Sequence, residues 1–495
     1  MLSPSNLLSL ALLYICLLFA VAWFTDHNSD AGTARRGARW RGWIYALSIT
    51  VYCSSWTFYG AVGSATAVPW SHAPIYLGPI LVFTLCWPVI RRLLAVGEQH
   101  RVTSIADYIG ARYGKRQSLA FIVTLVAAAA VLPYVALQFK ALAQAWTTIG
   151  GGEVDAVGGD TALLTAIILA VFTILFGTRR LDGRERHQGV MTAVAVESLV
   201  KLLAFFAVAV LALVYLNGLP DAEHTMAEHS WGLPLSADFA AQTLISALAI
   251  LCLPRQFHVM VVEAQGERST GTARWLVPLY LLLFMVMVVP ISQAGSHVFA
   301  VAEQHNPDTY VQLLPVALEA DWIAVAAFIG GISAATGMVI VATVALAIMI
   351  TNEVVAPLIM RSSALSPSAV LKLGDSLRRV RQVTIAGIML AAWLVARWIM
   401  EIPWLTQIGF ICFLAAAQLA PPLLAGLYWQ RAHGRAVLIG LSLGLATWFY
   451  CGVLPVVLPA GHALLELGPL GIDWLRPLHL FGISGEARLA YATLW

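Results

Sequence analysis

Long apolar segments constrain the fold of this chain more than any other feature. A window of about 19 residues finds segments long enough to cross a hydrocarbon layer of about 30 Å. We place them near residues 6–24, 43–64, 75–96, 118–147, 161–177, 189–216, 237–254, 275–299, 321–351, 383–399, 404–429 and 435–457. Composition agrees, since 60% of the 495 residues are hydrophobic, 11% are charged and the mean hydropathy is +0.80. The sequence therefore predicts an all-α integral membrane protein with about twelve helices.

Lysine and arginine predict the orientation of these helices, because cells retain them on the cytoplasmic side during insertion. When the loops are counted alternately, one side holds 24 of the 29 basic residues, with Arg255 among them. The opposite loops, such as residues 150–160 and 217–231, hold none before residue 458. We therefore expect both the N-terminus and the tail from residue 458 to lie outside. The net charge of +3 is then a consequence of topology, and we expect lipid rather than nucleic acid as a partner.

Cysteine, histidine and glycine patterns favour no cofactor. The cysteines stand singly in apolar segments without a CxxC pair, and the chain has no phosphate-binding loop, HExxH or dinucleotide fingerprint. One outer loop, "DAEHTMAEH", gathers groups that could bind a metal, but their spacing matches no established site. They are Asp221, Glu223, His224, Glu228 and His229. We therefore expect a solvated loop there, no bound metal and no enzyme chemistry.

The second segment, "ALSITVYCSSWTFYGAVGSA", places Ser54, Ser55, Thr57, Gly60 and Gly63 in its middle and outer half. Such residues allow a helix to unwind and expose carbonyls that bind a cation or a solute. They equally allow close helix packing. From spacing alone the two interpretations are balanced.

The seventh segment ends in "ALAILCLPRQFHVMVVEAQGER", in which Pro254 removes a helix hydrogen bond and predicts a kink. The alternative is an ordinary helix end at the cytoplasmic face. Because segments two and seven are five helices apart, segments 2–6 and 7–11 would form two halves of opposite orientation. Each half would open with an interrupted helix, which is typical of an inverted-repeat secondary transporter.

At these motifs the chain resembles the sodium/solute symporter family, which includes the sodium/proline symporter, over roughly residues 40–430. The resemblance rests on "CSSWTFYG", "TSIADYIGARYG", "LPYVALQFKALAQAW", "RQFHVMVVE" and "ISAATGMVIVATVALAIMITNEVVAPLIMR". The stretches "FGTRRLDGRERHQGVMTAVAVESLVKL" and "LCLPRQFHVMVVE" are more similar to the transporter-like membrane domain of CbrA-type bacterial sensor histidine kinases. In such kinases this domain is fused to cytoplasmic signalling modules and linked to histidine uptake.

The resemblance implies a LeuT-like inverted-repeat bundle in a bacterial inner membrane, with thirteen helices in the family. This chain supplies about twelve and ends in an apolar run, so we expect a truncated thirteenth helix. We expect an extra helix and basic loop over residues 1–42, a transporter core over 43–430 and a twelfth helix with an outer tail over 431–495. The implied function is cation-coupled symport of a small polar solute, such as the amino acid histidine, by alternating access. The alternative is a solute-sensing domain with fused or associated kinase modules.

The same resemblance predicts the residues of the site. We expect the solute to contact Ser54, Ser55, Trp56, Tyr134, Gln256 and His258. Coupling would involve the backbone carbonyls of Thr50 and Cys53, together with Thr336, Glu197 and Lys201. Tyr52 stands where the sodium/proline symporter has an acidic residue, so Na⁺ and H⁺ both stay open as the coupling ion.

Glu197 and Lys201 lie one helical turn apart inside an apolar segment, so their side chains can form an ion pair. Such a pair would either fix helix packing or take part in coupling. In the loop "TSIADYIGARYGKR" we expect a short amphipathic helix, with Ser104 as its cap and Ile105, Tyr108 and Ile109 on one face.

Overall fold

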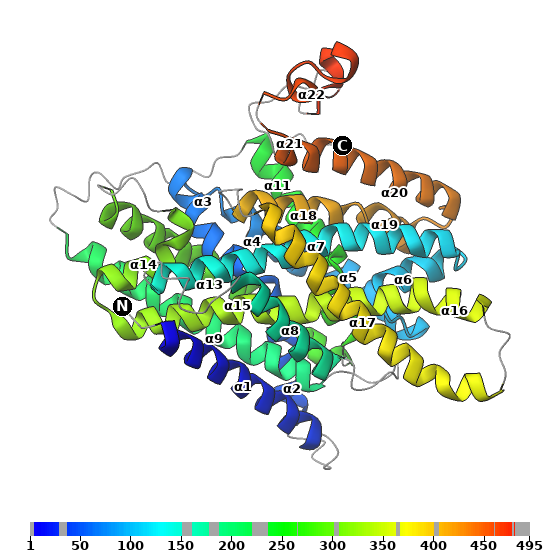
Figure 1. Cartoon of the computed structure of the whole chain (residues 1–495), viewed down its shortest axis with the longest axis horizontal. Coiled ribbons are helices and arrows are strands. Elements are labelled where there is room, and N and C mark those ends of the chain that lie inside the picture. The colour runs from blue at the N-terminus through cyan, green and yellow to red at the C-terminus, as the bar shows by residue number, and fades with distance from the viewer. Residues whose placement is uncertain are drawn as a thin grey trace.

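The computed structural model describes residues 4–28, 37–150, 161–177, 188–219, 236–264, 266–300, 306–362, 367–399, 405–459, 461–477 and 480. Within these ranges the chain is a bundle of helices whose long members run side by side (Figure 1). Eight helices are long and apolar enough to span a membrane, or ten if two bent pairs are counted as spans. This confirms the predicted all-α membrane fold. The acidic outer loop and the last apolar run lie outside the described residues.

Each of the twelve predicted segments corresponds to one helix or to consecutive helices. The continuous ones are α1 (Pro4–Asn28), α7 (Gln117–Ile149), α8 (Thr161–Gly177), α9 (Gln188–Asn217), α13 (Gly266–Val298), α15 (Asp321–Met349) and α17 (Pro367–Ile399). The remaining spans are made of consecutive pieces, because proline, glycine or hydroxyl side chains interrupt the backbone ladder. The later pieces are α18 (Leu405–Ala417), α19 (Ala420–Tyr428), α20 (Gly434–Trp448), η8 (Phe449–Val453) and α21 (Leu454–Val457).

Segments two, three and seven are interrupted. Segment two consists of α2 (Gly37–Ile49), η1 (Thr50–Tyr52), η2 (Trp56–Gly60) and α3 (Ala61–Ala67). In segment three, α4 (Ala73–Thr84) and α5 (Trp87–His100) meet at 71°. Segment seven consists of α11 (Ala237–Cys252), α12 (Pro254–Phe257) and η5 (His258–Val262), and bends by 52°.

The core lies around α15. In its most apolar window 94% of the residues are buried, against 22% in α1 and in the α20 span. Its small residues, such as Gly330, Gly331 and Gly337, allow side chains of α9 and of the π-helical turn of segment two to pack closely against it. In Figure 1, α1 and α20 lie at opposite edges of the bundle, and α22 (Ala463–Glu466) projects beyond α20. The residues at the interruptions of segments two and seven are likewise buried.

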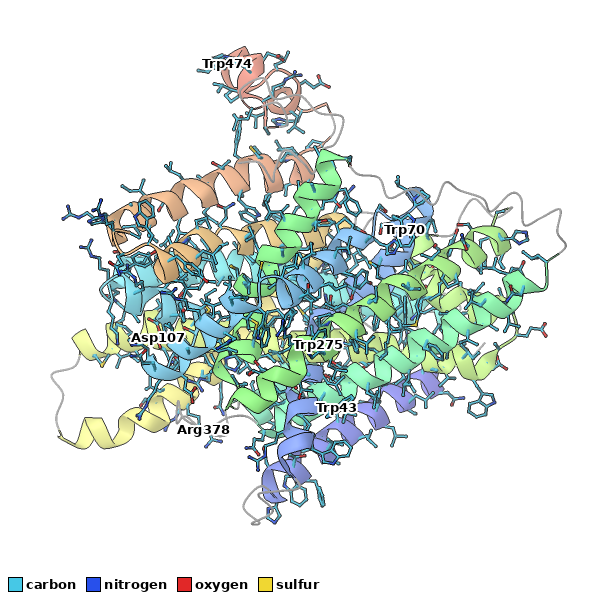
Figure 2. The ribbon with its side chains drawn as sticks, turned by 180° about the vertical axis from the view of Figure 1, so that it is seen from behind. Trp43, Trp70, Asp107, Trp275, Arg378 and Trp474 are labelled. Atoms are coloured by element: carbon cyan, nitrogen blue, oxygen red, sulfur yellow. The ribbon has the colours of Figure 1, made fainter. Side chains whose placement is uncertain are left out.

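Short elements cover the two ends of the bundle. They are α6 (Ile105–Arg112), η6 (Pro307–Thr309), α14 (Tyr310–Ala317), η7 (Ile350–Val355) and α16 (Ala356–Ser362). In contrast, η9 (Pro469–Gly471) and η10 (Asp473–Leu475) lie in the part that projects beyond α20, where Figure 2 labels Trp474. Asp107 and Arg378 lie toward one end and Trp70 toward the other (Figure 2). This grouping agrees with the predicted alternation of loops. The predicted short helix is confirmed as α6, because the Ser104 hydroxyl accepts a hydrogen bond from Asp107 N at 3.0 Å and Ile105, Tyr108 and Ile109 are buried.

Candidate binding site at the broken helices

The interruption of segment two begins where β-branched residues are followed by two serines. Ile49, Thr50 and Val51 have modest helix propensity, and serine hydroxyls compete with the backbone for hydrogen bonds. The helix tightens over Thr50–Tyr52 and leaves the helical conformation at Cys53, whose ψ is 100°. It resumes as a π-helical turn at Trp56. The Cys53 carbonyl is thereby available to a group from another helix, and the Thr50 carbonyl, which accepts from Cys53 N at 3.0 Å, can accept a second hydrogen bond.

Two buried glutamines hold this interruption in place. The Gln138 side-chain oxygen, from α7, accepts a hydrogen bond from Ser55 N at 3.0 Å. The Gln256 side chain, from α12, donates to Ile49 O at 3.2 Å and accepts from Tyr52 N at 2.9 Å, in the amide orientation that satisfies both groups. Gln256 thus joins the two broken segments directly, which is the meeting that the inverted-repeat interpretation requires.

Segment seven breaks where proline predicts it, but the break is internal. Leu253 adopts an extended ψ of 127° before Pro254, and all four residues of α12 are buried. The alternative of an ordinary helix end at the cytoplasmic face is therefore wrong. Arg255 is 1% exposed and does not lie on a cytoplasmic loop, where the count of basic residues placed it.

The predicted solute contacts gather around Tyr134 on α7. The Ser54 hydroxyl is 2.7 Å from the Tyr134 hydroxyl. Trp56 packs edge-on against Tyr134, and against Phe410 and Phe413 of α18 with ring centroids 5.1 and 4.7 Å away. All six predicted residues are buried, with His258 the most exposed at 4%. The structure therefore shows the cluster closed to solvent.

The Arg255 guanidinium completes this cluster. Its central carbon lies 4.2 Å from the centroid of the Tyr134 ring, within cation–π range. Its Nε and Nη2 have no hydrogen-bond partner within the described ranges. The same holds for the Ser55 hydroxyl and the Trp56 indole N–H. Three buried side chains of this region, Arg255, Ser55 and Trp56, thus have unused hydrogen-bonding capacity.

His258 differs from the other predicted solute contacts. It lies in the π-helical turn after α12, and its Nε2 is 3.5 Å from Oε1 of Glu263. This carboxylate orients the ring near the end of segment seven. His258 thus contacts a side chain that the sequence analysis did not assign to the site.

The predicted coupling residues lie on the other side of the same break. Lys201, from α9, is 2% exposed, and its ammonium donates to Thr50 O at 3.2 Å and to Cys53 O. Glu197 accepts a hydrogen bond at Oε1 from the Thr336 hydroxyl of α15, at 2.6 Å. The structure thus brings together the two carbonyls, Lys201, Glu197 and Thr336.

The ion pair expected between Glu197 and Lys201 does not form. The two side chains act on each other electrostatically, but each forms its hydrogen bonds with a different helix. The reason is geometric, since α9 lies between η1 and α15 and the side chains diverge toward these neighbours. Oε2 of Glu197 has no hydrogen-bond partner among the described residues and faces Gly337.

A carboxylate covers the end of this region near Trp70. Asp308, in η6, accepts a hydrogen bond from Leu405 N at 3.3 Å, and the Thr406 hydroxyl donates to Gly60 O at 3.1 Å. Burial raises the pKa of Asp308 to about 6, although the Leu405 N–H and the charge of Lys140 act in the opposite direction. These contacts join the start of α18 to segment two.

Sequence reasoning missed three residues of this site. Arg255 was interpreted as a topology signal, although an arginine directly after a helix-breaking proline in an apolar segment is also a site signal. Gln138 is an amide in the largely apolar middle of a predicted span, and Asp308 follows the proline of an outer loop. Only the folded arrangement shows that these groups converge on segment two.

Comparisons with known proteins agree with this arrangement. No family model matches the chain. An uncharacterised symporter of Bacillus subtilis, YodF, is 23% identical over 256 residues, which are 50% of this chain and 47% of that protein. The chain thus matches about half the length of this curated relative.

The solved structure of a Na⁺-coupled sialic acid symporter, described as a substrate-bound outward-open state, aligns over 98% of this chain and 96% of its own. The TM-score is 0.65 and the sequence identity 14%. Both proteins are transporters, in agreement with the prediction of a transporter rather than an enzyme. The chain therefore has the LeuT-like fold of a Na⁺-coupled symporter, and half of its sequence is similar to that of a symporter.

Proposed function

We propose that the protein is a cation-coupled symporter for a small solute with a carboxylate, such as the amino acid histidine. It would work by alternating access in a bacterial inner membrane, with its N-terminus outside. The observation that supports this best is the buried Arg255 guanidinium, whose Nε and Nη2 are unused in the described structure. The LeuT-like fold and the similarity to YodF support transport in general.

A carboxylate is the group that best fits Arg255. An unpaired buried cation costs several kcal/mol, so an arginine retained at 1% exposure needs a compensating anion. The guanidinium edge offers parallel N–H groups that match the two oxygens of a carboxylate. The guanidinium lies over the Tyr134 ring, while the buried carboxylates Glu197 and Glu263 contact the Thr336 hydroxyl and the His258 ring. We therefore assign the anion to the solute.

The remaining free groups suit the rest of an amino acid. The Ser55 hydroxyl can accept from an ammonium or imidazole N–H, and the Trp56 indole can donate to a neutral ring nitrogen. Trp56, Tyr134 and Phe413 provide flat surfaces for a planar side chain. A histidine-sized solute would displace Trp56 from its contacts with α18, which links binding to movement of that helix.

Alternating access requires that the cover of the site can open. The contacts of Asp308 and Thr406 close the end near Trp70, and the Tyr45 hydroxyl bonded to Met260 O at 2.6 Å closes the opposite end. Each contact is a single hydrogen bond worth about 1 kcal/mol net. A solute bound at Arg255 can therefore shift the balance between the two closures.

Uptake of labelled histidine into proteoliposomes tests the proposal, with Na⁺ and H⁺ gradients imposed separately. We expect accumulation under at least one gradient, competition by other amino acids, and little competition by histamine, which lacks the carboxylate. Arg255→Gln should abolish uptake, while Arg255→Lys should retain the charge but lose the paired donors, raising the KM at least about tenfold.

The matched control is Arg397→Gln. Arg397 also lies in a helix over an aromatic ring, 5.5 Å from the centroid of Trp393, but it is exposed at the edge of the bundle. Its replacement should leave uptake unchanged. The proposal fails if neither gradient drives accumulation, or if histamine competes as well as histidine.

A further inference from the structure

The Lys201 ammonium lies where the broken helix offers its carbonyls. Thr50 O and Cys53 O flank the interruption, and both accept hydrogen bonds from Lys201 Nζ. An ammonium and a Na⁺ ion carry the same charge and bind the same oxygen atoms. With the nitrogen 3.2 Å from Thr50 O, a metal ion at bonding distance from these carbonyls would overlap it.

We propose that Lys201 is the resident cation of this break, so that the protein needs no Na⁺ there and a proton shared by Lys201 and Glu197 is the coupling ion. The proposal rests on the function proposed above. A protonated Lys201 ties α9 to the break in segment two. When the amine gives its proton to the Glu197 carboxylate, it loses its charge and the carboxylate becomes a neutral acid, so the attraction to the carbonyls weakens.

The surroundings of Glu197 suit a proton acceptor. Its Oε2 has no hydrogen-bond partner in the described chain and lies over Gly337, where an added Cβ would collide with it. A small cavity between α1, α8, α9 and α15 adjoins Glu197 and is about the size of one water molecule. The carboxylate therefore has a free oxygen that can accept a proton, while the other side chains that line this cavity are apolar.

The groups around the pair link proton binding to solute binding. Lys201 is attracted by the carboxylate of Glu197, repelled by the guanidinium of Arg255, and also interacts electrostatically with Cys53. The phenol of Tyr14, from α1, faces Glu197. A solute carboxylate at Arg255 would neutralise the charge that repels Lys201. Solute binding would thereby favour proton binding, and linkage requires the reverse to hold equally.

Thermal unfolding of the purified chain tests the cation site without any solute. Na⁺ is exchanged for choline at constant ionic strength. We expect the wild-type midpoint to stay the same, because Lys201 already occupies the carbonyls. Lys201→Ala leaves the two carbonyls without the ammonium, next to Glu197. Na⁺ should then raise the unfolding midpoint of this variant by at least about 2 °C. Lys140→Ala is the matched control, since its ammonium binds a different carbonyl, Ile399 O, and it should gain no such rise.

A Na⁺-dependent rise in the wild type would overturn the proposal, as would the lack of any Na⁺ response in Lys201→Ala. If that variant does not fold, Lys201→Gln replaces it, and binding of radioactive Na⁺ to the wild type decides independently, since saturable binding overturns the proposal. In proteoliposomes without Na⁺, a proton gradient should drive uptake. Absence of uptake under every gradient would defeat the proposed function, whereas uptake that requires Na⁺ would defeat only this inference.

Discussion

The free oxygen of Glu197 determines what can stand opposite it on α15. Gly337 is the residue that faces this oxygen, and any side chain there would collide with it. The requirement is steric rather than conformational, because Gly337 lies in a regular helix where alanine would otherwise be favoured by about 1 kcal/mol. The glycine thus leaves the space that the Glu197 carboxylate occupies.

Gly337→Ala should lower the unfolding free energy by about 1–3 kcal/mol, because the carboxylate must move away from Thr336 or the helices must separate. The apparent unfolding midpoint in detergent measures this. Gly387→Ala is the control, since no atom outside its own helix lies within 4 Å of the added Cβ. It should be neutral or slightly stabilising. Equal effects of the two replacements would contradict the packing argument.

Asp308 should make stability depend on pH, because its pKa is raised to about 6 by burial. A carboxyl group whose pKa is raised by folding binds its proton more tightly in the folded chain than in the unfolded one. The contribution of Asp308 to the free energy of unfolding is therefore complete below the ordinary carboxyl pKa of about 4. As pH rises through 6, the free energy of unfolding falls by up to about 3 kcal/mol.

Unfolding midpoints of the wild type and Asp308→Asn, compared from pH 4.5 to 8, test this expectation. The wild type should lose stability relative to the variant as pH increases, because the amide does not titrate. A difference that stays constant across this range would show that Asp308 is ionised throughout and that the Leu405 N–H and Lys140 dominate its environment.

At the scale of elements, local sequence signals specified short helices well and buried interruptions poorly. The cap, charge and apolar face of α6 all lie within ten residues, so the sequence was sufficient to place it. The path of segment two depends on Gln138 and Gln256, which are remote in sequence. The spacing of small and hydroxyl residues indicates that the helix can unwind. It does not indicate which side chains form hydrogen bonds with the backbone groups that unwinding exposes.

The cap of α6 gives a prediction at this scale. Ser104→Ala removes the acceptor for Asp107 N and should destabilise the helix by about 1 kcal/mol. The readout is faster amide hydrogen exchange in residues 105–112, with global unfolding little changed. Ser442→Ala is the control, because that exposed hydroxyl only bonds to Leu438 O within its own helix. Unchanged exchange in Ser104→Ala would show that tertiary packing alone holds α6.

At the scale of the whole molecule, hydropathy predicted the number and order of segments because a membrane requires apolar lengths. The serine- and glycine-rich stretch of segment two and Pro254 of segment seven, rather than hydropathy, indicated the two breaks. Hydropathy could not show that Arg255 belongs to the interior, since the same residue satisfies a count of cytoplasmic charge. Nor could it show that α9 directs Glu197 and Lys201 to different partners, because helical spacing describes one helix and not its neighbours.

The two glutamines that hold segment two open have a consequence for the whole cycle. An amide keeps the same charge at every physiological pH, and each of these has both a donor and an acceptor engaged. The two amides that hold the break thus do not change charge, although Glu197, Lys201 and the Arg255 guanidinium lie close to it. The hydrogen bonds that hold the break therefore stay the same when protons or solutes bind and leave beside it.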